Sequence, residues 1–197
     1  MVKVNLRNTK ILWYLSIFNA LLYVLMFLLP AKLLGLNIYP FVFVESWLYS
    51  TVCFIYIIMI LLWFNEKTAI VAAFTMFTVL LEIAIAVNAF PGLLKGAYTS
   101  SLDILLEVVS LLVIFRSFTV KAAAVSLPFK LFGASIAMIS LPRFAMMLIS
   151  ITINEQVLQI ANDIGLLLML GSLAFVLKRT LGFLKNNPKG VVEEVVE

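Results

Sequence analysis

The stretch KAAAVSLPFKLFGASIAMISLPRFAMMLISITINE, residues 121–155, combines the pattern of a membrane-spanning helix with a cationic side chain well inside it. That residue is Arg143, directly after Pro142. A cationic group there costs about 2.5–3.5 kcal/mol on insertion scales, so a partner is needed to satisfy it. The candidates are the embedded acids Glu82, Glu107 and Asp163. We expect Arg143 to reach one of them at hydrogen-bond length, directly or through a water molecule.

The composition is that of an integral membrane protein. The chain of 197 residues is 64% hydrophobic and 12% charged, with a mean hydropathy of +1.15. Soluble domains are about 45–50% apolar and about 25% charged. The apolar runs are continuous and about twenty residues long, which indicates transmembrane helices rather than the short alternating segments of an outer-membrane barrel. We therefore predict an all-α integral membrane bundle, multi-pass in the cell membrane, with the lipid bilayer as its surroundings.

Six apolar runs predict six transmembrane helices, separated by segments with turn-forming or charged residues. The predicted spans are residues 11–29, 45–64, 68–90, 102–118, 129–153 and 154–181, and residues 182–197 form a polar cytoplasmic tail. Pro30 and Pro40 bracket the first loop, a tight turn at 65–67 joins the second and third spans, and Pro91 ends the third span.

The distribution of lysine and arginine predicts the orientation of the bundle. With six spans, one side carries Lys3, Arg7, Lys10, Lys67, Arg116, Lys121, Lys178, Arg179, Lys185 and Lys189, and the other carries Lys32 and Lys95. Ten basic residues against two is a strong positive-inside signal, so both termini are predicted to be cytoplasmic. The net charge of +4 reflects these span ends and does not indicate nucleic-acid binding.

Depth along the helices brings the embedded charges to a common level. At about 1.5 Å per residue, Glu82 and Arg143 each lie roughly 20 Å above the start of their spans, and Glu107 lies about 8–9 Å below the outer end of its descending span. In a hydrocarbon core about 30 Å thick, these three residues share the outer half of the membrane. Asp163 is predicted near or slightly above them, on a span whose outer end carries a polar stripe of Glu155, Gln159 and Asn162.

This polar cluster has a structural and a functional interpretation, and the sequence leaves both open. It could be a buried salt bridge that fixes helix packing. It could also be a site for a cation, a proton or a polar head group, because intramembrane ionisable residues are candidate functional sites. The chain has no histidine, a single cysteine and no recognisable catalytic motif. We therefore predict no catalytic residue, no metal site and no cofactor.

Residues 11–118 resemble the DoxX/DoxD-like four-helix membrane proteins. The resemblance is carried by a first span ending in a proline-containing loop, by Glu45 opening the second span, by the short turn at 65–67 and by Pro91-Gly92 closing the third span. It implies a respiratory or quinone-linked role, with a quinone or lipid as a candidate partner. The last two predicted spans lie outside the resemblance.

From these features we expect a non-catalytic subunit of a larger membrane complex, with other membrane subunits as partners. The reasons are the lack of chemistry of its own and the abundant apolar surface. The alternative is a small solute transporter or substrate-binding membrane component that uses the intramembrane acid/Arg site. Six spans in so short a chain, with both ends inside, are also similar to the substrate-binding components of energy-coupling vitamin transporters. A membrane enzyme acting on lipid or quinone has the least support.

Overall fold

The computed structural model describes residues 4–28, 39–89, 97–149 and 153–187, and in these ranges the chain forms helices joined by turns. Within these ranges there are six α-helices and no strand. The helices are α1 (Leu6–Leu28), α2 (Tyr39–Trp63), α3 (Thr68–Ala89), α4 (Ala97–Phe118), α5 (Ser126–Ile149) and α6 (Glu155–Asn186). The all-helical prediction is confirmed for these residues. The ends at 1–3 and 188–197 lie outside the described residues, and so does most of the predicted polar tail.

Three of the described helices are long and apolar enough to cross a membrane. They are α3 over Thr68–Val87, α5 over Ser126–Met146 and α6 over Glu155–Asn186, and α2 adds a shorter apolar stretch, Leu48–Trp63. Large apolar side chains are exposed on the outer faces of the helices, as is favourable where lipid is the solvent. The helices are therefore suited to a membrane-embedded bundle.

Several helices begin earlier than the hydrophobic runs predicted. Helix α2 starts at Tyr39 rather than Glu45, with Pro40 in its first turn, where proline removes no helical hydrogen bond. Helix α4 starts at Ala97 rather than at Leu102, because polar residues can occupy a helix end without interrupting it. Helix α1 starts at Leu6, and the Asn5 side chain accepts a hydrogen bond of 2.7 Å from the backbone N–H of Asn8.

The last two helices also differ from the predicted bounds. Helix α5 runs from Ser126 to Ile149 and stays helical through Pro142, as prolines can within membrane helices. Helix α6 begins after Asn154, whose side chain caps it by accepting a 2.9 Å hydrogen bond from the N–H of Gln156. It continues to Asn186, beyond the predicted end at Leu181, and in these last turns the Phe183 ring packs edge-on against Trp63 and Phe64 at the end of α2.

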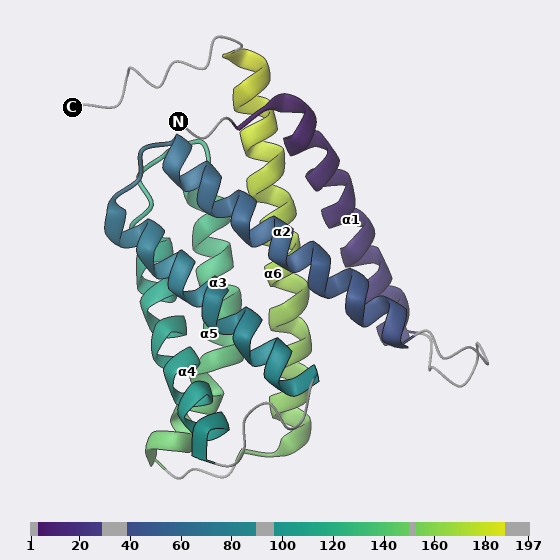
Figure 1. Cartoon of the computed structure of the whole chain (residues 1–197), viewed down its shortest axis with the longest axis vertical. Coiled ribbons are helices and arrows are strands. Elements are labelled where there is room, and N and C mark those ends of the chain that lie inside the picture. Colours follow the sequence, from purple (N-terminus) through teal and green to yellow (C-terminus); the bar gives the residue numbers. More distant parts are fainter. Residues whose placement is uncertain (1–3, 29–38, 90–96, 150–152, 188–197) are drawn as a thin grey trace.

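Consecutive helices run in opposite directions (Figure 1), and the contacts between the six described helices form a closed ring. Each helix contacts its neighbours in the chain, α1 closes the ring by packing along α6, and α2 also touches α6. The start of α1 and the end of α6 lie at the same end of the bundle, uppermost in Figure 1. We call this the terminal end, and the other the far end.

The packed core is mostly aliphatic and contains a cluster of phenylalanine rings toward the terminal end. The Phe74 ring stacks on Phe132 with ring centroids 5.5 Å apart and meets Phe129 edge-on at 5.4 Å. Phe54 packs edge-on against Phe132 at 6.0 Å, and all four side chains are at most 1% exposed. These aromatic pairs join α2, α3 and α5 and fill that half of the bundle.

Two connections at the terminal end are joined by a buried carboxylate. Helix α2 ends in a left-handed cap in which Asn65 has a φ of 53° and Glu66 N–H bonds the carbonyl of Leu61 at 3.0 Å. The same Glu66 side chain, 8% exposed, accepts hydrogen bonds of 2.8 Å and 2.6 Å from the backbone N–H groups of Lys121 and Ala122. The α2–α3 turn therefore holds the α4–α5 connection in place.

Candidate functional site

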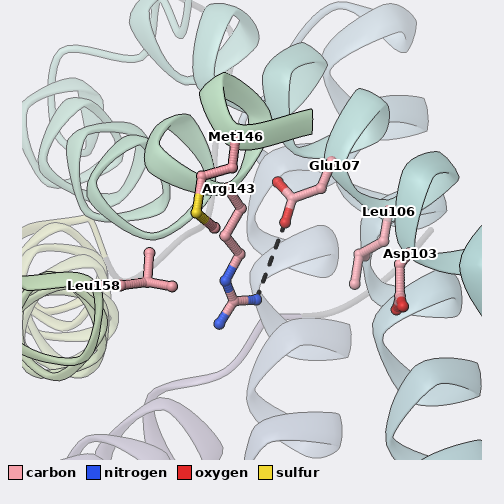
Figure 2. Close-up of a pocket in the computed structure, with 6 residues that line it drawn as sticks. All are labelled: Asp103, Leu106, Glu107, Arg143, Met146 and Leu158. Atoms are coloured by element: carbon pink, nitrogen blue, oxygen red, sulfur yellow. Dashed lines mark ion pairs between the residues drawn. The ribbon is translucent and has the colours of Figure 1, made fainter. Parts of the chain in front are cut away.

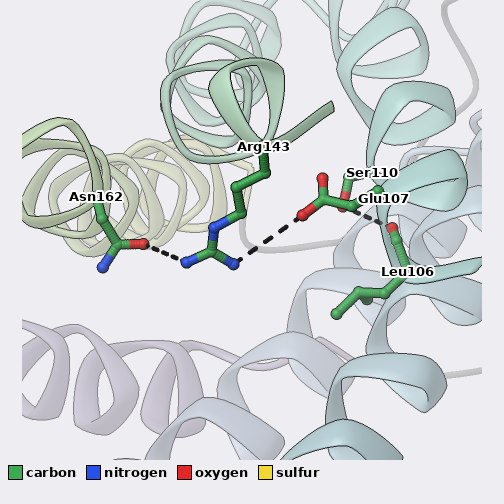
Figure 3. A network of polar contacts seen from close by, with 5 residues as sticks. All are labelled: Leu106, Glu107, Ser110, Arg143 and Asn162. Atoms are coloured by element: carbon green, nitrogen blue, oxygen red, sulfur yellow. Dashed lines mark hydrogen bonds and ion pairs between the residues drawn. The ribbon is translucent and has the colours of Figure 1, made fainter. Parts of the chain in front are cut away.

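Arg143 is held between two helices by one ion pair and one hydrogen bond. Its Nη1 lies 4.0 Å from Oε1 of Glu107 on α4, and its Nη2 donates a 3.0 Å hydrogen bond to Oδ1 of Asn162 on α6 (Figure 3). The separation from Glu107 is longer than a hydrogen bond. The predicted direct hydrogen bond to an acid is therefore not formed, and the amide of Asn162 takes that place.

The two charged partners differ strongly in exposure. The Arg143 side chain is 45% exposed, whereas the Glu107 side chain is only 8% exposed. Oε2 of Glu107 is buried and receives no hydrogen bond within the described part of the chain, although the Ser140 hydroxyl lies next to the carboxyl. A buried carboxylate oxygen without a donor is costly, so this side chain is under-satisfied as the helices stand.

A cavity of about 460 Å³ opens beside this pair, which we call the wide cavity. Its walls come from three helices: Asp103, Leu106 and Glu107 from α4, Arg143 and Met146 from α5, and Leu158 from α6. Figure 2 shows the guanidinium extending from α5 into the space between these helices, with the Glu107 carboxyl directed toward it. On α4 and on α5 the first lining residue is three or four positions before the other lining residues of its helix, and residues at that spacing share one helix face.

A second cavity of about 240 Å³, the narrow cavity, lies deeper and shares three wall residues with the wide one. The shared residues are Leu106, Glu107 and Arg143. The rest of its lining is mostly apolar, with two hydroxyls and one amide. These further residues are Phe77, Leu81, Ser110, Ile136, Ile139, Ser140, Asn162, Leu166 and Met169. The ion pair thus stands between an open, charged space and a more apolar one.

The other two predicted acids face different neighbours. Glu82 accepts a 2.8 Å hydrogen bond from the Thr51 hydroxyl of α2, and Asp163 accepts one of 3.1 Å from the Tyr23 hydroxyl of α1. Neither residue lines the wide or the narrow cavity. Of the four predicted cluster residues, the structure brings together Arg143 and Glu107 only.

The angular position of each residue on its helix explains this separation. Successive residues of an α-helix point about 100° apart. Asn162 faces Arg143 on α5, so the next residue, Asp163, turns toward α1. In the same way Leu81 lines the narrow cavity, whereas Glu82 turns toward α2. The predicted depths put the acids at a similar level, but the rotation of each helix about its axis determines which acid reaches Arg143.

Sequence reasoning missed two polar members of the site. Asn162 was assigned only to a polar stripe, and Asp103, which lies inside the predicted span 102–118, was not among the candidate acids. Asp103 and Glu107 stand four residues apart on α4, which puts both on one face of the helix. That spacing was the available signal for the second carboxylate. No comparable pattern identified Asn162 as the hydrogen-bond acceptor of Arg143.

The chain matches no family model, no curated protein and no solved structure at a significant level. The resemblance of residues 11–118 to the DoxX/DoxD-like proteins therefore stays a prediction. The two cavities and the ion pair between them are the features of this chain that point to a function.

Proposed function

We propose that this protein is a multi-pass membrane component that binds a small solute or a lipid head group in the wide cavity, for transport or for delivery to a partner. The observation that carries the proposal is the Arg143–Glu107 pair, which stands where the wide and narrow cavities meet. A structural salt bridge is best enclosed by packing, whereas this arginine lines an open cavity, and its contacts with the described residues leave N–H donors unused.

The proposed membrane arrangement has six crossings with both termini in the cytoplasm. Its supports are the helix lengths and the alternating directions. The shortest described helices have 22 residues, or about 33 Å at the usual helical rise, against about 30 Å for the hydrocarbon core. With this orientation the terminal end is cytoplasmic and the wide cavity lies in the outer half of the bundle.

The binding proposal is tested by thermal unfolding of the purified protein against a solute panel and in nanodiscs of different head groups. Ligands stabilise the state that they bind, so a true ligand raises the unfolding temperature of the wild type. The same ligand should lose its effect with Arg143→Met. Asp163→Asn is the matched control, because Asp163 is also embedded but lies outside both cavities. If no solute or head group gives stabilisation that depends on Arg143, the proposal is wrong.

A second candidate function, the non-catalytic subunit of a larger complex, is favoured by the outer face of α4. Ile104, Val108, Leu112 and Phe115 form an exposed apolar stripe there, and the Phe115 side chain is 70% exposed. Such an unpartnered apolar stripe can pack against a helix of another membrane subunit. Native mass measurement after extraction in a mild detergent tests this role: co-purification with larger membrane proteins supports the subunit role, and an isolated monomer opposes it.

A further inference from the structure

The Glu107 carboxylate identifies what a ligand of the wide cavity has to supply. The side chain is more than nine-tenths buried and lines the cavity, and its Oε1 faces Nη1 of Arg143 at 4.0 Å, which is longer than a hydrogen bond. A carboxylate oxygen accepts hydrogen bonds and favours a positively charged donor. A ligand group that satisfies it is therefore an N–H or O–H donor, and an ammonium group satisfies it best.

The Arg143 guanidinium supplies the complementary requirement. It has five N–H donors in a planar fork, and the described contacts use one of them in the hydrogen bond to Asn162. The nearest carboxylate oxygen is 4.0 Å from Nη1, so the ion pair leaves hydrogen-bonding capacity on that nitrogen as well. The fork geometry suits a carboxylate or a phosphate, which it can bind with two parallel hydrogen bonds.

The charge balance of the cavity wall argues against a ligand with an acidic group alone. Asp103 and Glu107 bring two carboxylates against the single guanidinium of Arg143. An anion on the arginine would leave both carboxylates near it uncompensated, and a cation on the carboxylates would leave the arginine donors unused. A ligand that carries both charges can pair with the carboxylates and with the guanidinium at the same time.

We infer that the wide cavity recognises a zwitterion, in which a primary ammonium group faces Glu107 and Asp103 and a neighbouring carboxylate or phosphate faces Arg143. This inference rests on the proposed binding function and names its ligand class. The apolar wall of Leu106, Met146 and Leu158 accommodates a small apolar body next to the charged groups. Two sources share this chemistry: a free apolar amino acid and the head group of an aminophospholipid.

The soluble source is tested with three matched compounds on the wild-type protein in phosphatidylcholine nanodiscs. Leucine carries both charges, 4-methylpentanoate lacks the amine, and 3-methylbutylamine lacks the carboxylate. Phosphatidylcholine is a suitable background because its quaternary ammonium cannot donate a hydrogen bond. We expect leucine to bind at least about tenfold more tightly than either fragment, since each lost charge-assisted contact is worth about that factor.

The lipid source is tested by replacing part of the phosphatidylcholine with phosphatidylethanolamine or with phosphatidylglycerol. If the ligand is a head group, phosphatidylethanolamine raises the unfolding temperature and anionic phosphatidylglycerol does not. The selectivity should be lost with Arg143→Met, weakened with Glu107→Gln and Asp103→Asn, and kept with Asp163→Asn. The wild-type comparison of ligands stands even where a variant fails to fold.

The outcomes separate the two proposals. Zwitterion selectivity in either arm supports the inference. Equal binding of 4-methylpentanoate and leucine, or equal stabilisation by the two replacement lipids where leucine shows no selectivity, overturns the zwitterion and leaves an anion site. Equal binding of 3-methylbutylamine and leucine overturns it in favour of a cation site. An anion site or a cation site would still be consistent with the proposed binding function. If no ligand in the wider panel depends on Arg143, both the zwitterion inference and the proposed binding function are wrong.

Discussion

Nη1 of Arg143 lies 4.0 Å from Oε1 of Glu107, while Nη2 of the same guanidinium donates a 3.0 Å hydrogen bond to Asn162. One side chain of α5 thereby contacts both α4 and α6. Because the arginine is 45% exposed, the ion pair is partly screened and its contribution to stability is modest. The same exposure leaves the guanidinium accessible from the wide cavity.

The loss of stability on replacing Arg143 should depend on the charge of the new side chain. Arg143→Met is expected to lower the free energy of unfolding by about 1 kcal/mol, and Arg143→Glu by about 2 kcal/mol or more, because glutamate adds a third carboxylate beside Asp103 and Glu107. Denaturant unfolding in detergent measures both values. Arg116→Met, at an exposed arginine of α4, is the control and should change little. A methionine variant less stable than the glutamate variant would contradict this account.

Glu66 should be important for stability although it lies in a turn. Glu66→Ala leaves the backbone N–H groups of Lys121 and Ala122 without their acceptor, so a loss of about 2–3 kcal/mol is expected. Glu66→Gln keeps a carbonyl acceptor and should cost less. The exposed neighbour Lys67 provides a control, and Lys67→Ala should remain within about 0.5 kcal/mol of the wild type. Equal losses for the alanine variants at 66 and 67 would rule out the connecting role.

Asn65 occupies a left-handed conformation, with a φ of 53°, at the end of α2. A β-branched side chain is strained there, so Asn65→Val should destabilise the protein by about 1–2 kcal/mol. Glycine adopts this conformation freely, so Asn65→Gly should be neutral within about 0.5 kcal/mol or slightly stabilising. Thermal unfolding of the two variants side by side tests the cap, and a valine variant as stable as the glycine variant would refute it.

Close helix packing depends on Gly133 and Gly165. A Cβ at Gly133 would lie 2.8 Å from Cβ of Ser117 on α4, and one at Gly165 would lie 2.5 Å from Cγ1 of Ile139 on α5. Each glycine-to-alanine change should therefore cost about 1–3 kcal/mol through overpacking. Gly171 is the matched control on α6, because a Cβ there meets nothing within 4 Å. Gly171→Ala should be neutral or stabilising by up to about 1 kcal/mol, since alanine favours the helix.

The proposed topology predicts which positions a membrane-impermeant thiol reagent can label from outside. The native Cys53 is fully buried and should give little background. A cysteine placed at position 95 should be labelled in intact cells, whereas one at position 67 should require permeabilisation. Labelling at position 95 only after permeabilisation would exclude an arrangement with both termini in the cytoplasm.

Much of the fold follows from local features of the sequence. The continuous apolar runs predicted six helices, and the turn at 65–67 was located correctly, because hydrophobic length and turn chemistry act over a few residues. Helix ends were predicted less well. A proline in the first turn and polar residues at a helix start are compatible with helix but fall outside a purely apolar run, so hydropathy alone misses the starts of α2 at Tyr39 and α4 at Ala97.

The site required the tertiary structure. The sequence alone determined that Arg143 lies inside an apolar helix, and it predicted a partner, because the cost of a cation in hydrocarbon does not depend on the arrangement of the other helices. It could not select among Glu82, Glu107 and Asp163. The depth of a residue follows from counting along the helix, whereas the direction of its side chain depends on helix rotation and on which helices are neighbours. Packing of α5 between α4 and α6 brought Glu107 and Asn162 to the arginine, and turned Glu82 and Asp163 toward hydroxyls on other helices.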